Sequence, residues 1–164
     1  LVDGGGDATP DALIPELIAG FGGGRPAKLR RPRATRPWQH VLEPLSGYLT
    51  LAENLSPDRH DTAWNFGPAA EDELTVGGLA DEAARLWGSG ASWIDEDDGG
   101  PHEAGLLMVD SAKARSGLGW TPTLRVPEAI ALTVEWEQRV RGGETPLDVT
   151  RSQVEHYLAR GGVS

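Results

Sequence analysis

Apolar residues recur every three to four positions along several stretches of the chain, which is the pattern of amphipathic helices. Leu13, Leu17 and Phe21 mark the first stretch, and glycines 22–24 provide its end, so a helix is predicted over 13–21. A longer apolar stripe predicts a second helix over 41–54. The first third of the chain is thus expected to contribute two helices with one apolar face each.

Four further helices are predicted from capping residues and apolar spacing. Thr75 is a candidate N-cap for one of them, and Ser111 is a candidate N-cap for a short helix that stops at a glycine. Thr150 and Gln153 match a capping box at the start of the last helix. The four helices are expected at 76–87, 111–117, 126–141 and 150–160.

Short apolar runs between the helices predict strands at 27–30, 63–66 and 106–109. The expected fold class is therefore α/β, mostly helical, with short strands in an incomplete sheet. A complete doubly wound sheet would show a regular alternation of strands and helices, which this pattern lacks. At 164 residues the chain is expected to form one domain, 1–164, that represents part of such a fold.

Charge and composition narrow the classes of partner. The formal net charge of −10 argues against a broad nucleic-acid surface, although it leaves room for a local basic pocket. No apolar run is long enough to predict a membrane span, and no signal peptide is recognised. The absence of cysteine excludes disulfides and thiolate metal sites and favours a cytoplasmic location.

Several motifs of redox and metal enzymes are missing from the sequence. Glycines 4–6 and 22–24 are bare triplets without the spacing of a G-x-G-x-x-G loop, so the chain is not expected to bind a dinucleotide by itself. Neither Tyr48 nor Tyr157 is followed by Lys four residues later, and the four histidines lack metal-ligand spacing. Because the sequence opens without Met directly into a glycine loop, we interpret it as part of a longer protein.

Basic residues gather in one stretch of this acidic chain. They are Lys28, Arg30, Arg31, Arg33 and Arg36. Such runs are usually solvated charged loops, but a local anion site is the alternative, because the rest of the molecule repels anions. Arg36 is suited to that role, since a planar guanidinium can bind two phosphate oxygens at once.

The stretch Arg36-Pro37-Trp38-Gln39-His40-Val41-Leu42-Glu43-Pro44-Leu45-Ser46-Gly47-Tyr48-Leu49 resembles the CDP-glucose 4,6-dehydratase family, which are extended short-chain dehydrogenases/reductases. The resemblance continues in order through Gly4-Gly5-Gly6-Asp7, Leu13-Ile14-Pro15, Trp64-Asn65-Phe66-Gly67-Pro68, Trp87-Gly88, Pro101-His102-Glu103-Ala104, Lys113-Ala114-Arg115, Leu118-Gly119-Trp120 and Thr133-Val134-Glu135-Trp136. It covers nearly the whole chain and implies the C-terminal, nucleotide-sugar-binding half of a Rossmann-type enzyme.

The resemblance also implies roles for individual residues. Arg36 would hold the substrate diphosphate, and Lys28, Leu29 and Arg30 would run past the pyrimidine, with Leu13 lining the same pocket. Asn65 and His102 would contact the nucleotide-sugar, but a turn-closing Asn and a surface-loop His are equally plausible from the residues alone. The implied substrate-binding set is Leu13, Lys28, Leu29, Arg30, Arg36, Asn65 and His102, with no catalytic residue among them.

The implied reaction converts CDP-glucose to CDP-4-keto-6-deoxyglucose, with NAD held by the other half of the enzyme and no cofactor expected for this chain alone. Departures from the family pattern stand at Leu1, Ala8 and Ala12, where relatives carry Asn, Trp and Arg. Two alternatives therefore stay open. One is another nucleotide-sugar dehydratase or epimerase, and the other is a non-catalytic remnant or interaction module. A homodimer or pairing with an NAD-binding half is the expected assembly.

Overall fold

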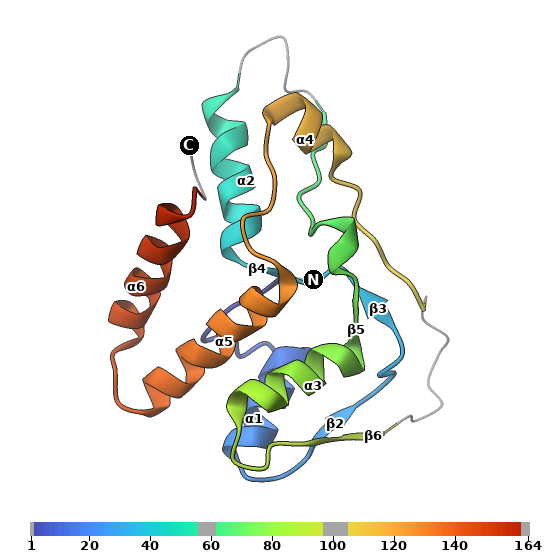
Figure 1. The fold of residues 1–164 in the computed structure, drawn as a ribbon, viewed down its shortest axis with the longest axis vertical. Coiled ribbons are helices and arrows are strands. Elements are labelled where there is room, and N and C mark those ends of the chain that lie inside the picture. Colours follow the sequence, from blue (N-terminus) through green and yellow to red (C-terminus); the bar gives the residue numbers. More distant parts are fainter. Residues whose placement is uncertain (1, 56–61, 97–104, 162–164) are drawn as a thin grey trace.

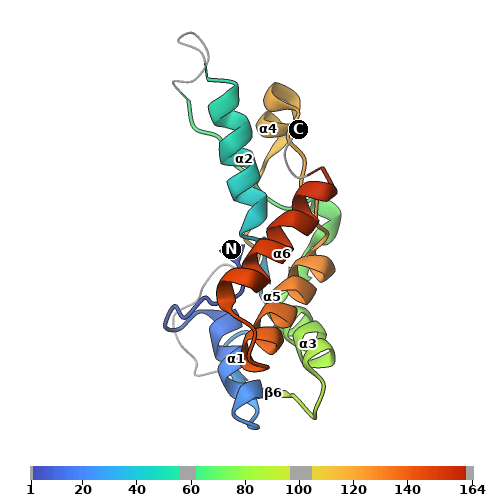
Figure 2. The same ribbon diagram turned by 90° about the vertical axis from the view of Figure 1, so that its left-hand side faces the viewer.

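The structure is a computed structural model that describes residues 2–55, 62–96 and 105–161. Figure 1 shows an elongated molecule with most of its helices at the lower end and two at the upper end. The helices are α1 (Leu13–Gly22), α2 (Leu42–Glu53), the short 3₁₀ helix η1 (Ala70–Asp72), α3 (Val76–Trp87), α4 (Ala112–Leu118), α5 (Val126–Arg141) and α6 (Pro146–Ala159). Figure 2 shows α6 beside α5, and α2 and α4 rising above them.

Among the described residues the strands are short and form three separate pairs. They are β1 (Val2–Asp3) with β4 (Gln39–His40), β2 (Ala27–Leu29) with β6 (Trp93–Asp95), and β3 (Thr35–Arg36) with β5 (Leu74–Thr75). The first two pairs are parallel and the third is antiparallel. Parallel strands normally lie inside larger sheets that helices cover on both faces. The prediction of a mostly helical fold with an incomplete sheet is confirmed.

The main hydrophobic core lies between α1, α3, α5 and strand β2. Leu17, Leu79 and Ile130 are fully buried there, one from each helix. Their positions follow the apolar spacing that predicted these helices. Trp38 extends the core towards β5, where its indole N–H donates to the carbonyl of Leu74 at 3.1 Å. This core holds the lower end of the molecule together.

Helix α2 buries the face that carries Glu43 and Ser46, and it leaves its apolar face exposed. Leu45, Tyr48 and Leu49 are 46%, 58% and 54% exposed, whereas Glu43 and Ser46 are buried. The apolar stripe of residues 41–54 correctly predicted a helix, but its apolar face lies on the surface. The inner face approaches its neighbours closely: a Cβ added at Gly47 would stand 2.3 Å from the ring of Phe66.

Glu43 fixes the start of α2 to the chain that precedes α5. Its carboxylate accepts hydrogen bonds from the backbone N–H of Leu124 at 2.7 Å and from the backbone N–H of Thr123 at 3.0 Å. Tyr157 of α6 donates from its hydroxyl to the same carboxylate at 3.2 Å. Burial raises the pKa of Glu43, and these hydrogen bonds oppose that rise. One buried carboxylate thus connects three separate segments.

Five predicted helices are confirmed with their bounds within a residue. They are α1 to α5, predicted at 13–21, 41–54, 76–87, 111–117 and 126–141. Thr75 is the N-cap of α3 as expected, because its Oγ1 accepts from the N–H of Gly78 at 3.0 Å. Ser111 occupies the N-cap position of α4, but its side chain makes no cap hydrogen bond. The carboxylate of Asp110 accepts from the N–H of Ala112 at 2.8 Å instead.

The predicted start of the last helix is wrong. Helix α6 begins at Pro146 with Thr145 as its N-cap, so the chain enters the helix earlier than the expected capping box at Thr150. Proline favours the first helical position because its fixed φ suits the helix and its missing N–H is not needed there. Thr150 lies inside the helix and accepts a hydrogen bond from the indole of Trp136 at 2.9 Å.

Two of the predicted strands are also wrong. Residues 63–66 have no regular secondary structure, and in 106–109 only Leu106 forms an isolated bridge, with Thr35. In the first segment Phe66 is buried against Trp120, with ring centroids 5.0 Å apart, whereas Leu106, Leu107 and Met108 of the second are exposed. Strand β2 was correctly predicted, whereas its partner β6, which is equally short, was not.

Candidate binding cleft

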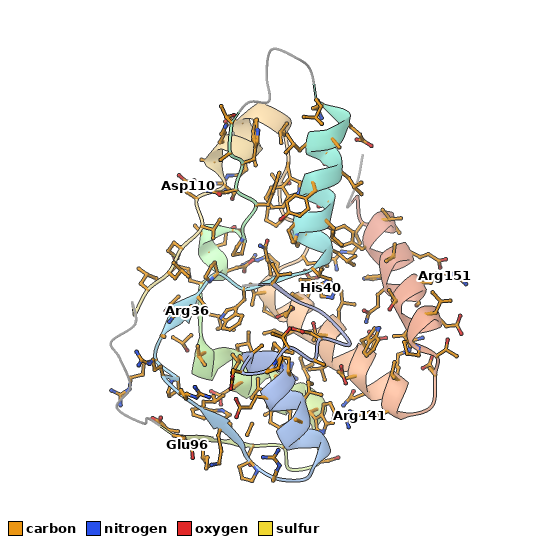
Figure 3. The ribbon with its side chains drawn as sticks, turned by 180° about the vertical axis from the view of Figure 1, so that it is seen from behind. Arg36, His40, Glu96, Asp110, Arg141 and Arg151 are labelled. Atoms are coloured by element: carbon orange, nitrogen blue, oxygen red, sulfur yellow. The ribbon has the colours of Figure 1, made fainter. Side chains whose placement is uncertain are left out.

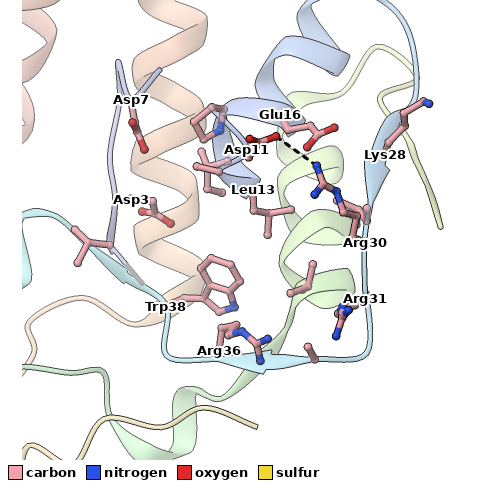
Figure 4. Close-up of a pocket in the computed structure, with 17 residues that line it drawn as sticks. Asp3, Asp7, Asp11, Leu13, Glu16, Lys28, Arg30, Arg31, Arg36 and Trp38 are labelled. Carbon is pink, nitrogen blue, oxygen red and sulfur yellow. Dashed lines mark hydrogen bonds and ion pairs between the residues drawn. The ribbon is translucent and has the colours of Figure 1, made fainter. Parts of the chain in front are cut away.

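An open cleft of about 420 Å³ lies between β1, the start of α1 and the segment from β2 to Trp38. Figure 4 shows side chains from these elements converging on it. The floor includes Leu13, Leu29, Trp38 and Val76, which also belong to or pack against the main core. The cleft therefore rests on the best-packed part of the molecule, and its charged walls are held by a rigid base.

Basic side chains form one wall of the cleft, on the β2–β3 segment. Lys28, Arg30, Arg31 and Arg36 all line it. Lys28 pairs with Glu96, which follows β6, at 2.5 Å, and Arg30 pairs with Asp11 at 3.3 Å across the mouth. Both pairs are well exposed, so each contributes little stability and can exchange for an anionic ligand.

Arg36 is half-buried at the inner end of this wall. Its Nη1 donates to the carbonyl of Thr35 at 2.9 Å, which fixes the guanidinium near the strand. Arg36 also lines a smaller cleft of about 230 Å³ that includes Asp110 and Arg115. Figure 3 shows Arg36 between Glu96 near one end of the molecule and Asp110 beside α4. It thus stands where the two clefts meet.

The N-terminus of α1 also lies at the cleft. Its N-cap is Ala12, which has no side-chain acceptor for the first-turn N–H groups, and Ala12, Leu13 and Ile14 all line the space. Uncapped N–H groups and the helix dipole favour an anion at this position. Glu16 in the same turn opposes that preference with its own negative charge.

Acidic side chains form the opposite wall, which the sequence analysis did not identify. Asp3 is 5% exposed, and Oγ1 of Thr133 donates to it at 3.3 Å. Burial raises the pKa of Asp3 to about 7. Asp7 is exposed, and hydrogen bonds from the hydroxyl and N–H of Thr9 lower its pKa. The glycine triplet between these two residues was the available signal in the sequence.

Of the seven predicted substrate-binding residues, the structure brings five together at this cleft. They are Leu13, Lys28, Leu29, Arg30 and Arg36. Asn65 is exposed and does not line the cleft. His102 lies outside the described residues. The roles of all seven residues stay predictions.

The glycine triplets do not fit the pyrophosphate of NAD. A Cβ at Gly5 would stand 2.0 Å from the indole of Trp136, and Gly6 has a φ of +80° beneath the same ring. The N–H of Gly6 donates to the Glu137 carboxylate at 3.0 Å, so this loop already holds an anion. A Cβ at Gly22 would meet the guanidinium of Arg141 at 2.6 Å. Close packing explains Gly5 and Gly22, and Gly24 has a φ of +64°, a conformation that favours glycine.

Within 2–55, 62–96 and 105–161, no cluster of three or more His, Asp or Glu side chains is arranged to hold a metal ion. In the same ranges no helix combines the length and apolar character that a membrane crossing requires.

Comparison with known sequences gives a match along nearly the whole chain. The sequence is 39% identical over 160 residues to CDP-glucose 4,6-dehydratase of Salmonella typhimurium, which covers 96% of this chain and 45% of that protein. The chain therefore spans about half the length of its curated relative. No protein-family model matches the sequence. The match confirms the resemblance that the motifs predicted.

Solved structures with the same fold include nucleotide-sugar enzymes. The UDP-glucuronic acid 4-epimerase of Bacillus cereus, solved with a fluorinated UDP-sugar and NAD, matches with a TM-score of 0.72 and 16% identity over 85% of this chain and 43% of its own. The dTDP-glucose 4,6-dehydratase of Bacillus anthracis, solved with NAD, matches with a TM-score of 0.70 and 18% identity over 90% and 45%. The chain is thus related to CDP-glucose 4,6-dehydratase and has the fold of the corresponding part of extended short-chain dehydrogenases/reductases.

Proposed function

We propose that the cleft binds a nucleotide-sugar, with CDP-glucose as the preferred ligand, and that the chain supplies the substrate-binding part of a CDP-glucose 4,6-dehydratase. The observation that carries the proposal is the basic wall. Four cationic side chains and the uncapped start of α1 face one cleft on a chain of net charge −10. The similarity to the Salmonella enzyme supports CDP-glucose as the ligand.

In this proposal the chain's own contribution is to bind and orient. Arg36 and its basic neighbours neutralise the diphosphate, and the apolar floor of Leu29 and Trp38 excludes water beneath it. NAD supplies the hydride chemistry of the whole reaction. Since the glycine loops here do not fit NAD, the isolated chain is expected to show no turnover of CDP-glucose. Conversion by the purified chain with added NAD would contradict this.

The choice of base is the finer part of the proposal. Several structural neighbours were solved with UDP-linked sugars, and their likeness to this chain is in fold alone. Lys28 and Glu96 face each other at the rim, where donor and acceptor groups can discriminate between bases. CDP-glucose, UDP-glucose and dTDP-glucose are therefore compared as competitors, and preference for either of the last two would reassign the substrate within the same class.

We also propose that the chain works in an assembly, because its upper end is incomplete. The exposed apolar face of α2, with Leu45, Tyr48 and Leu49, resembles a surface that another chain covers. A polypeptide equivalent to the unmatched part of the Salmonella enzyme is the proposed partner, and a homodimer is the alternative. A cytoplasmic location stays a prediction from the sequence.

Calorimetric titration with CDP-glucose tests the proposed function. The unsubstituted chain is expected to bind saturably, and Arg36→Ala is expected to weaken binding at least about tenfold, because a charge-assisted bidentate contact is lost. Arg33→Ala is the matched control, since Arg33 is exposed, belongs to the same basic run and does not line the cleft. Equal binding by both variants, or no binding by a folded chain, would contradict the proposal.

A further inference from the structure

Asp3 is a buried carboxyl group at the edge of an open cleft, which is an unusual place for a charge. Figure 4 shows it on the β1 side, across from Arg30 and Arg31, with its carboxyl group directed towards Leu13 and Trp38. Only 5% of the residue is exposed, yet it lines the cleft. A buried polar group normally needs hydrogen-bond partners to offset its lost hydration.

The chain itself gives this carboxyl group little compensation. Thr133 donates to Oδ1 of Asp3 at 3.3 Å, but the same hydroxyl lies 3.1 Å from the carbonyl of Ala129. A threonine has one hydroxyl proton, so it can serve only one of these acceptors at a time. The raised pKa of Asp3 agrees, because burial outweighs both the hydrogen bond from Thr133 and the attraction of the amino terminus, and Asp7 adds a like charge. Asp3 thus retains acceptor capacity that a ligand in the cleft can use.

The two walls of the cleft differ in the chemistry that they accept. A diphosphate is attracted to the basic wall at Arg30, Arg31 and Arg36 and repelled by an ionised Asp3. A hydroxyl group has the opposite preference, since it donates its proton to a carboxylate and gains a charge-assisted hydrogen bond. The arrangement therefore fits a ligand with an anionic part and a hydroxyl-bearing part.

We propose that Asp3 accepts a hydrogen bond from a hydroxyl of the sugar in the bound nucleotide-sugar, and so directs the sugar towards β1 and the diphosphate towards the basic wall. This inference rests on the proposed function and adds a residue that distinguishes a nucleotide-sugar from a bare nucleoside diphosphate. Asp3 is a specificity residue in this role, and it takes no part in proton transfer.

The test compares CDP-glucose with CDP, which share the base and the diphosphate but differ in the sugar. Calorimetry at pH 8 is run on the unsubstituted chain, on Asp3→Asn and on Asp3→Leu. Affinity for CDP-glucose is expected to fall about threefold in Asp3→Asn, which keeps a neutral acceptor, and about tenfold or more in Asp3→Leu. Affinity for CDP is expected to stay the same or to rise slightly, because a repulsive charge is removed.

Asp7→Asn is the matched control for charge. Asp7 lines the same wall, but it is exposed and already paired with Thr9. Its substitution is expected to change the affinities for CDP and CDP-glucose by the same factor. Thermal unfolding of each variant establishes that the chain is folded before titration, so a loss of binding cannot come from unfolding.

A pH series gives a second readout. The ratio of CDP-glucose to CDP affinity is expected to rise from pH 6 to pH 8 as Asp3 ionises, and to stay flat in Asp3→Asn. The other charged groups near Asp3 are Asp7 on its own loop, the amino terminus, His40 on the paired strand β4 and Arg36 across the cleft. Of these, Asp7 and Arg36 face both ligands alike, and burial lowers the pKa of His40 to about 4, below the range of the series. The amino terminus is the same in the unsubstituted chain and in Asp3→Asn, so the comparison of their pH series removes its effect.

The outcomes separate this inference from the proposed function. Unchanged CDP-glucose affinity in Asp3→Leu, with CDP binding intact, would overturn the role of Asp3 and leave the proposed function standing. A folded chain that binds neither ligand would overturn both. Selective loss of CDP-glucose binding together with the flat pH ratio would establish the role of Asp3.

Discussion

The two ends of the molecule are built from similar helices but differ in how completely they are packed. We call α1, β2, α3 and α5 the cleft end, and α2 with α4 the upper end. The cleft end buries its apolar faces in one cluster that includes Leu17, Leu79 and Ile130. The upper end has a small buried cluster of Phe66, Ala114 and Trp120, and it leaves the apolar face of α2 on the surface.

This difference in packing indicates which region holds its structure without another polypeptide. The cleft rests on the well-packed end, so its basic wall is positioned without help from another polypeptide. The upper end depends on polar contacts at Glu43 and Ser46 in place of apolar burial. Ligand binding is therefore expected to survive in the isolated chain, whereas the upper end is expected to be the less stable region.

The sharpest test of this contrast is a pair of leucine truncations. Leu79→Ala is expected to lower the free energy of unfolding by about 3 to 5 kcal/mol, because it leaves a cavity in the main core. Leu49→Ala on α2 is expected to change it by less than about 0.5 kcal/mol, since that side chain is already exposed. Urea unfolding measures both. Similar losses for the two variants would show that the apolar face of α2 is buried after all.

The β1–β4 pair gives a second test through pH. The folded-state pKa of Asp3 is about 7, above its ordinary value of 3.8, so the folded chain binds this proton more tightly than the unfolded chain. The resulting penalty is absent below about pH 4 and complete above about pH 7. Asp3→Asn is thus expected to be as stable as the unsubstituted chain near pH 4, and more stable near pH 8 by about 4 kcal/mol at most.

The pKa shift of His40 changes stability with pH in the opposite direction to that of Asp3. Burial lowers its pKa from 6.5 to about 4, so the unfolded chain binds this proton first and stability falls as the pH drops through that window. In Asp3→Asn the fall is expected to reach about 3 kcal/mol between pH 7 and pH 4, because the opposing effect of Asp3 is removed. Unfolding curves at several pH values measure how the free energy of unfolding changes with pH in the unsubstituted chain and in Asp3→Asn. If the substitution left this pH dependence unchanged, Asp3 would not ionise in a buried position.

Glu43→Gln probes the polar contacts of the upper end. It is expected to cost about 2 kcal/mol, since an amide oxygen can no longer serve both Leu124 and Tyr157 as the carboxylate does. Glu53→Gln, at the exposed end of the same helix, is the matched control and is expected to have no effect. Hydrogen exchange of α2 and α6 locates the change. Faster exchange confined to α1 and α3 would contradict the assignment.

The smallest effect on stability is expected from Leu49→Lys. The free energy of unfolding should change by less than about 0.5 kcal/mol, while self-association measured by sedimentation should fall, because the substitution places a charge on the apolar face of α2. Leu147→Lys is the control, since Leu147 is 64% exposed on α6. If both variants reduced association equally, general surface hydrophobicity and not α2 would be responsible.

Helix α2 shows what the spacing of apolar residues can predict and what it cannot. The apolar spacing of 41–54 correctly predicted a helix, because spacing reports local conformation. It could not reveal that Glu43 and Ser46 face inward, since their burial depends on Trp120 and Tyr157, which lie far along the chain. The same reason explains why 63–66 was mistaken for a strand.

At the candidate site, one wall could be predicted from the sequence and the other could not. The basic run from Lys28 to Arg36 was visible in the sequence, and all but Arg33 of its cations line the cleft. The acidic wall was not predicted, because Asp3 comes to face the run only after β1 pairs with β4.

Neighbouring residues and ordered motifs were enough to predict helices α1 to α5, the basic run and the relationship to CDP-glucose 4,6-dehydratase. The folded arrangement was needed to reveal which helix faces are buried, that two oppositely charged walls share one cleft, and that Asp3 is buried beside that cleft. Burial and electrostatic environment are set by residues distant in sequence, and that is the physical reason a local pattern cannot contain them.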